Sequence, residues 1–236
     1  MQAPQMMQTN ERQVFSRLKE SIQTGKGISL ESDFAIRIGT ILWDFAEAPT
    51  WNGEIPRLLS AQRGTFAKQI ARFLHENGPE RDSGLFTAWQ EFSGEVQQMR
   101  RCDSPYVQAF REGLYSLDTA MRGGRAQDVF QASNRLLGLG PGLTPAGDDF
   151  LLGCLATWRS FGIPLSLLYQ GDDCLAQIKR RTTTVSYFML EQCLQGFVND
   201  AFVQLFEKQE LEAFLNIGST SGVDMLIGAM FSMQHI

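Results

Sequence analysis

Two short segments of the chain place an aspartate between glycines at the start of an apolar stretch. The first is GDDFLLG, Gly147 to Gly153, and the second is GVDMLIG, Gly222 to Gly228, so both fit the pattern G-x-D-x-L-x-G. Hydroxyl residues precede both, Thr144 in the first and Ser219 to Ser221 in the second. A hydroxyl cap followed by an acidic residue is typical of a helix N-terminus. We expect the two segments to be related corners of one site, and convergence through capping rules is the alternative.

The loop before the first segment, LGLGPGLTPAG over residues 137–147, is rich in glycine and proline. Glycines let backbone amides approach an anion closely, and a helix N-terminus adds N–H groups and a favourable dipole. No Gly-Lys-Ser/Thr follows, and the glycine spacing differs from GxGxxG, so the loop lacks both common nucleotide-binding fingerprints. The loop predicts a site for a small anion, and a tight connection between two packed helices is the alternative.

Three aspartates are the candidate catalytic residues: Asp148, Asp149 and Asp224. A carboxylate would repel an anion in the same pocket unless a divalent cation, a partner arginine or protonation neutralised it. Asp149 is the candidate ligand for a Mg²⁺ ion, and Arg181, in KRRTTTVS, is the candidate arginine. A solvated helix start with threonine caps is the alternative for that segment. The candidate substrate-binding residues are Gly140, Gly142, Thr144, Gly147, Arg181, Thr182, Thr183, Thr220, Ser221 and Gly222.

The composition of the chain indicates which classes of binding partner to expect. The chain has 236 residues, 43% of them hydrophobic, and a formal charge of −5, which argues against nucleic acid because its binding needs a broad cationic face. The apolar stretches are shorter than the ~18 residues needed to cross a bilayer, and no signal peptide is apparent. Four cysteines without CxxC spacing indicate reduced thiols and a cytoplasmic protein. His75, near an expected helix C-terminus, is assigned a capping or surface role.

The order of elements predicts an α+β fold, predominantly helical with a small N-terminal β portion. We expect a helix over residues 1–27, two or three strands over 28–51 and a loop at 48–56. Residues 1–56 then form one portion and residues 57–236 a helical, anion-binding portion, together one compact unit. Helical segments are expected at 57–78, 85–99, 126–138, 148–162, 166–179, 183–206 and after 216–222.

GLGPGLTPAGDDFLLG, RRTTTVS and GSTSGVDMLIG, in this order, resemble the signature blocks of the bacterial DUF2877 family. That family includes the third subunit of the oxamate carbamoyltransferase of anaerobic allantoin degradation. IGTILWDFAEAPTWNGEIP also resembles the family's β-rich start, with Ala48 and Trp51. The chain departs from the family pattern at Ala146, where serine is commoner, and at Val223, where an aromatic residue is frequent. Neither departure changes a charged group.

The resemblance implies a subunit of a transferase that converts oxalurate and phosphate to oxamate and carbamoyl phosphate, together with other protein subunits. All these substrates are small anions, which suits an anion site built from a glycine loop and helix N-termini. Two alternatives stay open. One is a non-catalytic scaffold whose glycine loop packs against partner subunits, and the other is a Mg²⁺-dependent hydrolase that uses the three aspartates.

Overall fold

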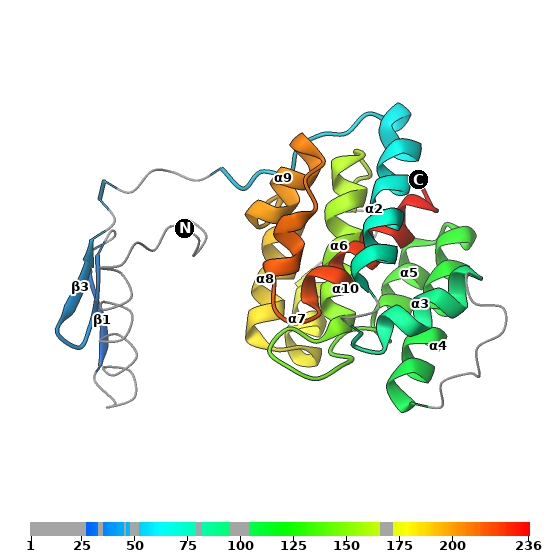
Figure 1. Ribbon diagram of the computed structural model, residues 1–236. Coiled ribbons are helices and arrows are strands. Elements are labelled where there is room, and N and C mark those ends of the chain that lie inside the picture. The colour runs from blue at the N-terminus through cyan, green and yellow to red at the C-terminus, as the bar shows by residue number, and fades with distance from the viewer. Residues whose placement is uncertain are drawn as a thin grey trace. The chain divides into compact units, whose positions relative to one another are not determined.

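Within residues 1–52 the computed structural model describes an antiparallel three-stranded sheet (Figure 1). The structure describes residues 27–32, 35–44, 46–47, 52–78, 82–94, 104–165 and 172–236. The strands are β1 (Ile28–Ser32), β2 (Ala35–Ile38) and β3 (Ile41–Asp44). A tight turn at Gly39, whose φ is 59°, joins β2 to β3. The strands expected over 28–51 are therefore confirmed, whereas the helix expected over 1–27 lies, apart from Gly27, outside the described residues.

Residues 53–236 form a separate helical unit. Within the described residues this unit contains nine α-helices, which together with the sheet confirms the α+β, mostly helical prediction. They are α2 (Arg63–Asn77), α3 (Leu85–Ser93), α4 (Pro105–Gly123), α5 (Ala126–Ser133), α6 (Ala146–Ser160), α7 (Asp172–Arg181), α8 (Thr184–Gln195), α9 (Asp200–Lys208) and α10 (Ser221–Met233), with short 3-10 turns at Ser60–Gln62 and Glu212–Asn216. None of the described helices combines the length and the apolar character that a bilayer crossing requires.

The helix expected as one segment over residues 183–206 is in fact two helices. Gly196 ends α8 with a φ of 107°, a left-handed conformation that favours glycine. Asn199 then begins α9, because its side chain accepts a hydrogen bond from the amide of Phe202. In the same way Gly94 ends α3 at Ser93, earlier than expected. In both cases glycine supplies a stop that apolar periodicity does not reveal.

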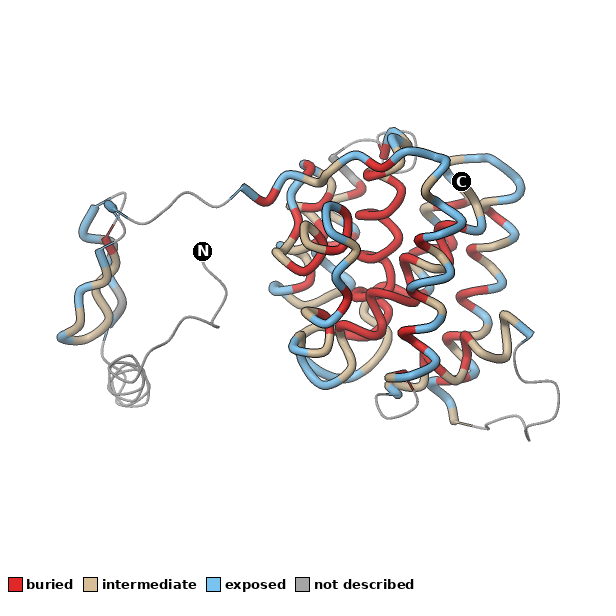
Figure 2. The backbone as a smooth tube through the Cα atoms, turned by 45° about the horizontal axis from the view of Figure 1, so that its top comes forward, coloured by how far each residue is buried: buried red, intermediate tan, exposed pale blue. Residues whose placement is uncertain are grey.

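Helix α6 is the centre of the core, and Figure 2 shows it buried over almost its whole length. Arg159 is the one residue of this helix that is not buried, and in α10 only Ser221 and Met230 are not. A helix that is apolar all round must be enclosed by other elements. The aromatic rings of Phe150 in α6 and Phe231 in α10 pack edge to face, with centroids 5.4 Å apart.

Helices α6 and α10 cross at very short range and run in the same direction. A Cβ atom on Gly153 would lie 1.9 Å from the carbonyl oxygen of Met225, and one on Gly228 would lie 1.9 Å from that of Phe150. Further along, Trp158 Nε1 donates to the carbonyl of Ser232 at 3.3 Å. The two G-x-D-x-L-x-G segments therefore pack reciprocally, each using its second glycine to admit the backbone of the other.

Candidate functional site

The parallel crossing brings the N-termini of α6 and α10 together. The hydroxyls of Thr144 and Ser221 lie 3.0 Å apart and share a hydrogen bond across the two helix starts. Two segments separated by 77 positions thus meet at one corner of the helical unit. Asp149 and Asp224, which occupy equivalent positions in the two segments, lie in the first turns of these helices.

Asp149 and Asp224 are buried carboxyls with unsatisfied oxygens. Their residues are 2% and 0% exposed, and Oδ2 of each has no hydrogen-bond partner within the described residues. Burial, with the charges of Asp224 and Asp148 adding to it, raises the pKa of Asp149 to about 8, although the hydroxyls of Ser221 and Thr144 oppose the rise. Burial likewise raises the pKa of Asp224 to about 7. Asp149 is therefore mainly a neutral acid at pH 7.

Asp148 has a different environment, because its oxygens are used to join three segments. Oδ1 accepts a hydrogen bond from the amide of Gly138 at 2.7 Å, and Oδ2 accepts one from the hydroxyl of Thr182. Burial raises the pKa of Asp148, while these two hydrogen bonds lower it. Asp148 therefore connects the glycine loop to the junction of α7 and α8.

Ser83 is a member of this corner that the sequence did not point to. Its hydroxyl donates to Oδ1 of Asp224 at 2.8 Å, across 141 positions of the chain. The neighbouring Asp82 accepts a 2.6 Å hydrogen bond from the amide of Gly84, just before α3. No local pattern marks Ser83, because only the packing of α3 against α10 brings it to Asp224.

The backbone amides expected to cradle an anion have partners inside the protein. Gly147 N donates to Leu139 O at 2.9 Å, and Gly222 N donates to Ile217 O at 3.2 Å. The amides of Asp148, Asp149 and Asp224 also donate to backbone carbonyls. Both glycines are required for packing, since a Cβ on either would lie within about 2.0 Å of a carbonyl oxygen. Gly140 and Gly142 adopt left-handed conformations, with φ of 113° and 103°.

The segment KRRTTTVS, residues 179–186, lies beside this corner, and the guanidinium of Arg181 donates to a backbone carbonyl. Arg181 is exposed, and its Nη1 donates to the carbonyl of Asn134 at 3.1 Å. None of the ion pairs described for residues 27–236, gaps excepted, includes Asp148, Asp149 or Asp224. Thr183 caps α8 by accepting from Ser186 N at 3.1 Å, and its hydroxyl donates to Leu143 O at 2.5 Å. Thr220 is the N-cap residue of α10.

The described residues contain no cluster of side chains suited to hold a metal ion. Among the residues that the structure describes, no group of three or more His, Cys, Asp or Glu side chains is arranged to hold a metal ion. A Mg²⁺ ion at Asp149 stays a prediction.

Apart from Ser83, the residues of this corner lie within a segment that matches a known family. Residues 136–233 match the family model described as oxamate carbamoyltransferase subunit AllH. Over these residues, which are less than half of the chain, the chain is similar to this family. A family described as a subunit implies other protein subunits in its enzyme. No solved structure matches the chain.

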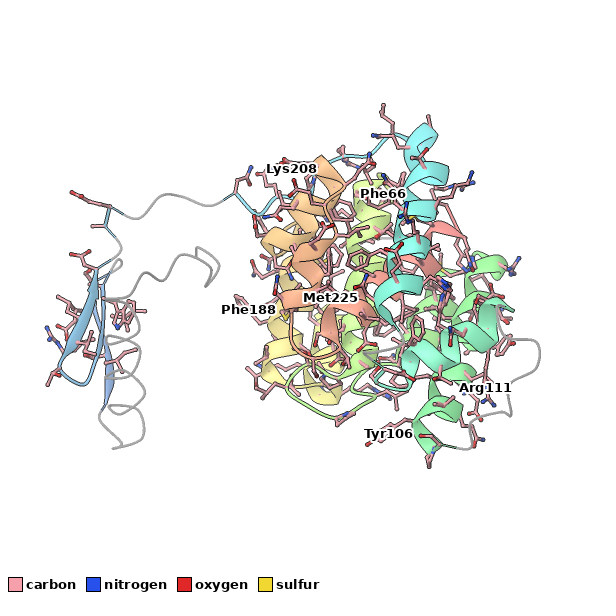
Figure 3. The ribbon with its side chains drawn as sticks, in the orientation of Figure 1. Phe66, Tyr106, Arg111, Phe188, Lys208 and Met225 are labelled. Atoms are coloured by element: carbon pink, nitrogen blue, oxygen red, sulfur yellow. The ribbon has the colours of Figure 1, made fainter. Side chains whose placement is uncertain are left out.

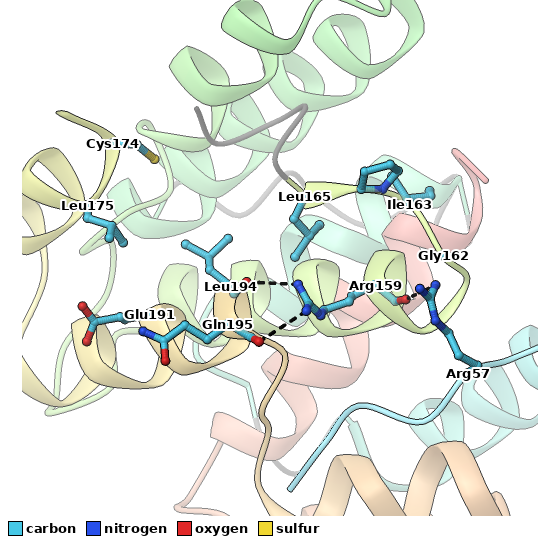
Figure 4. Close-up of a pocket in the computed structure, with 11 residues that line it drawn as sticks. Arg57, Arg159, Gly162, Ile163, Leu165, Cys174, Leu175, Glu191, Leu194 and Gln195 are labelled. Atoms are coloured by element: carbon cyan, nitrogen blue, oxygen red, sulfur yellow. Dashed lines mark hydrogen bonds between the residues drawn. The ribbon is translucent and has the colours of Figure 1, made fainter. Parts of the chain in front are cut away.

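A pocket lies away from the carboxyl corner, beside the C-terminal ends of α6 and α8 (Figure 4). Its volume is about 510 Å³. Arg57, Arg159 and Glu191 are its charged lining residues. Sequence reasoning did not single out any of the three. Arg57 and Arg159 stand 102 positions apart, and each is a lone arginine without a motif around it.

Proposed function

We propose that this chain is a member of the AllH family and takes part in carbamoyl transfer, the conversion of oxalurate and phosphate to oxamate and carbamoyl phosphate. We place its reactive corner at the joined N-termini of α6 and α10. One observation carries the proposal: at this corner, inside the segment that matches the family, Asp149 and Asp224 each have a buried carboxyl oxygen with no hydrogen-bond partner among the described residues. An unpaired buried polar atom is costly, so its retention favours a functional role.

Protonation resolves the conflict between carboxylates and an anionic substrate. A neutral Asp149 carboxyl donates a hydrogen bond to an anion instead of repelling it, and no arginine is needed for this. Two helix N-termini add positive potential at the same corner. Of the three ways to neutralise these aspartates, the burial of the pair and the outward position of Arg181 support protonation.

The proposed proton movements balance. An oxygen of hydrogenphosphate attacks the carbamoyl carbon of oxalurate, and the bond from that carbon to the oxamate nitrogen breaks. Ionised Asp224 takes the proton of hydrogenphosphate, and protonated Asp149 gives a proton to the departing nitrogen. After the products leave, Asp224 releases its proton to solvent and Asp149 takes one up, which restores both groups. Both carboxyls are enclosed, so residues 141–144 of the glycine loop, whose first three members are exposed, must move aside to admit substrate.

The decisive test uses the enzyme complex assembled with this chain and its other subunits. We expect Asp149→Asn to lower kcat for oxalurate phosphorolysis by about 100-fold, because it removes the proton donor. Glu76→Gln, on the exposed face of α2, is the matched control and should leave kcat unchanged. If the Asp149→Asn complex kept the wild-type kcat and phosphate affinity, Asp149 would not be the proton donor. Loss of phosphate affinity in Arg181→Ala alone would favour the arginine alternative instead.

A scaffold is the second candidate function, and an exposed apolar patch favours it. Leu143, Val185 and Phe188, which we call the loop patch, are 75%, 45% and 59% exposed. The hydrogen bond from Thr183 to Leu143 O holds the glycine loop against the start of α8, where the other two residues lie. Lys179 and Arg180 are exposed just before this helix. A partner subunit with apolar side chains ringed by carboxylates fits this surface.

The loop patch gives a separate prediction. We expect Phe188→Ser to weaken binding of this chain to the other subunits of the complex at least tenfold, measured by calorimetry, because it removes apolar contact area. Tyr106→Ser is the control, since Tyr106 is similarly exposed but lies on α4, apart from Phe188 on α8 (Figure 3). Equal affinities for both variants would exclude the patch as an interface. The scaffold function itself requires full activity in the Asp149→Asn complex.

A further inference from the structure

We infer that the pocket at the C-terminal ends of α6 and α8 is a binding site for a small carboxylate with a short apolar body. Asp149 and Arg159 are ten residues apart in α6, so the pocket begins about 15 Å along the helix from the carboxyl corner. This site goes beyond the proposed function, and it can hold a ligand whether or not Asp149 transfers a proton.

The pocket is large enough for a metabolite and continues into a second hollow. Its volume of about 510 Å³ falls in the range usual for small-molecule sites. An adjoining hollow of about 220 Å³ shares Arg57, Arg159 and Gln195 with it. Both arginines therefore line the two spaces, and Glu54 also lines the smaller one. Figure 4 shows the two arginines in the larger pocket.

Both arginines donate hydrogen bonds to backbone carbonyls at helix ends, and each keeps further N–H groups that make no described hydrogen bond. Arg159 donates from Nη1 to Leu194 O at 3.0 Å and from Nη2 to Gln195 O at 3.3 Å. Arg57 donates from Nη1 to the carbonyl of Arg159 at 3.2 Å. Arginine carries five N–H donors, so these described bonds leave further N–H groups on each guanidinium. Capping the helix ends fixes the two cations without using up their capacity to bind an anion.

Two glycines allow the guanidiniums to lie against the backbone. A Cβ on Gly162 would lie 2.7 Å from Nη1 of Arg57, and a Cβ on Gly196 would lie 2.6 Å from Nη2 of Arg159. Both glycines have left-handed φ angles, 84° and 107°. The same arrangement, a glycine in contact with an arginine, thus occurs after the C-terminal end of α6 and at that of α8.

The remaining lining selects a ligand with an apolar part. Four side chains form an apolar wall: Ile163, Leu165, Leu175 and Leu194. The carboxylate of Glu191 accepts a 2.6 Å hydrogen bond from the hydroxyl of Tyr187, and it is the one acidic group of this lining against two arginines. Burial raises the pKa of Cys174 to about 11, so its thiol adds no charge. A ligand with a carboxylate near the two arginines and a short hydrocarbon chain against the apolar wall would match both the charged and the apolar parts of this lining.

Titration of the full chain with hexanoate, followed by ¹H–¹⁵N NMR, tests this site. We expect saturable shifts at the amides of Gly162, Leu194 and Gly196, and at least fivefold weaker binding in Arg57→Gln. Arg72→Gln is the matched control, because Arg72 is exposed on α2 and pairs only with the exposed Glu76 among the described ion pairs. Leu175→Phe, which fills the pocket and keeps both cations, should also weaken binding. Asp149→Asn should leave hexanoate binding unchanged.

Three outcomes would overturn the inference. Equal affinity for 1-hexanol would show that the arginines do not select the ligand. Equal affinity for inorganic phosphate would show that the apolar wall does not contribute. Hexanoate shifts that are absent, or that persist unchanged in both Arg57→Gln and Leu175→Phe, would show that no carboxylate site exists at this pocket.

Discussion

Gly153→Ala is expected to lower the free energy of unfolding by at least about 3 kcal/mol, the top of the usual range for overpacking. The new methyl group would lie 1.9 Å from the carbonyl oxygen of Met225, so α6 and α10 would have to separate along their whole crossing. The neighbouring atom is backbone and cannot turn away as a flexible side chain would. Urea unfolding at pH 7 measures the change.

Gly64→Ala is the matched control for this substitution. Gly64 lies in α2 with no neighbouring atom within 4 Å of the place that an alanine methyl group would take, so alanine there should stabilise by about 0.5 kcal/mol. Gly228→Ala should repeat the loss of Gly153→Ala, because it meets Phe150 O at the same distance. Similar unfolding free energies for Gly153→Ala and Gly64→Ala would contradict the described crossing.

Asp149→Asn is expected to raise stability at neutral pH and to flatten its dependence on pH. The pKa of Asp149 rises from 3.8 to about 8 on burial, so the folded chain binds more protons than the unfolded chain between these values. The contribution of Asp149 to stability is therefore greatest below pH 4, falls as the pH rises to about 8, and is constant above. At about 1.4 kcal/mol per pH unit, the fall between pH 4 and pH 7 is on the order of 4 kcal/mol.

Unfolding free energies of the wild type and Asp149→Asn at pH 5, 6, 7 and 8 measure this effect. The difference between the two proteins should widen with pH, because asparagine resembles the protonated acid and does not titrate. Glu76→Gln, which changes an exposed carboxylate in α2, should keep the wild-type slope. A constant difference over the whole range would mean that Asp149 is ionised in the folded chain.

These two predictions share a cause. The close helix crossing encloses the first turns of α6 and α10, and this burial raises the pKa of both carboxyls and keeps Asp149 mainly neutral at pH 7. A substitution that stabilises the chain while it slows carbamoyl transfer would be typical of a residue retained for function.

The sequence was informative where the signal is local. The glycines and aspartates of the two repeated segments correctly placed an aspartate in the first turn of α6 and of α10. The expected hydroxyl caps were wrong, because Pro145 is the N-cap residue of α6 and the side chain of Thr220, the N-cap residue of α10, makes no capping hydrogen bond. The shared second glycine also pointed to a close relation between the segments, because capping does not require Gly153 or Gly228. In the structure these glycines are the crossing points of the two helices.

The parts that could not be predicted depend on tertiary packing. Ser83 reaches Asp224 only because α3 packs against α10, and Arg57 reaches the end of α6 from an extended segment. Neither residue has neighbours in sequence that mark it. Arg181 illustrates the reverse case, because its cationic neighbourhood suggested a role in the corner while its guanidinium turns to the carbonyl of Asn134.

Carbon-13 NMR of aspartate carboxyls tests most directly whether the corner holds its protons at neutral pH. The chain would be labelled at the aspartate side-chain carboxyl and titrated from pH 4 to pH 9, with Asp149→Asn and Asp224→Asn used to assign the signals. We predict two resonances that titrate near pH 7 and pH 8, each absent from one variant. Titration of every aspartate below pH 5 would contradict the account.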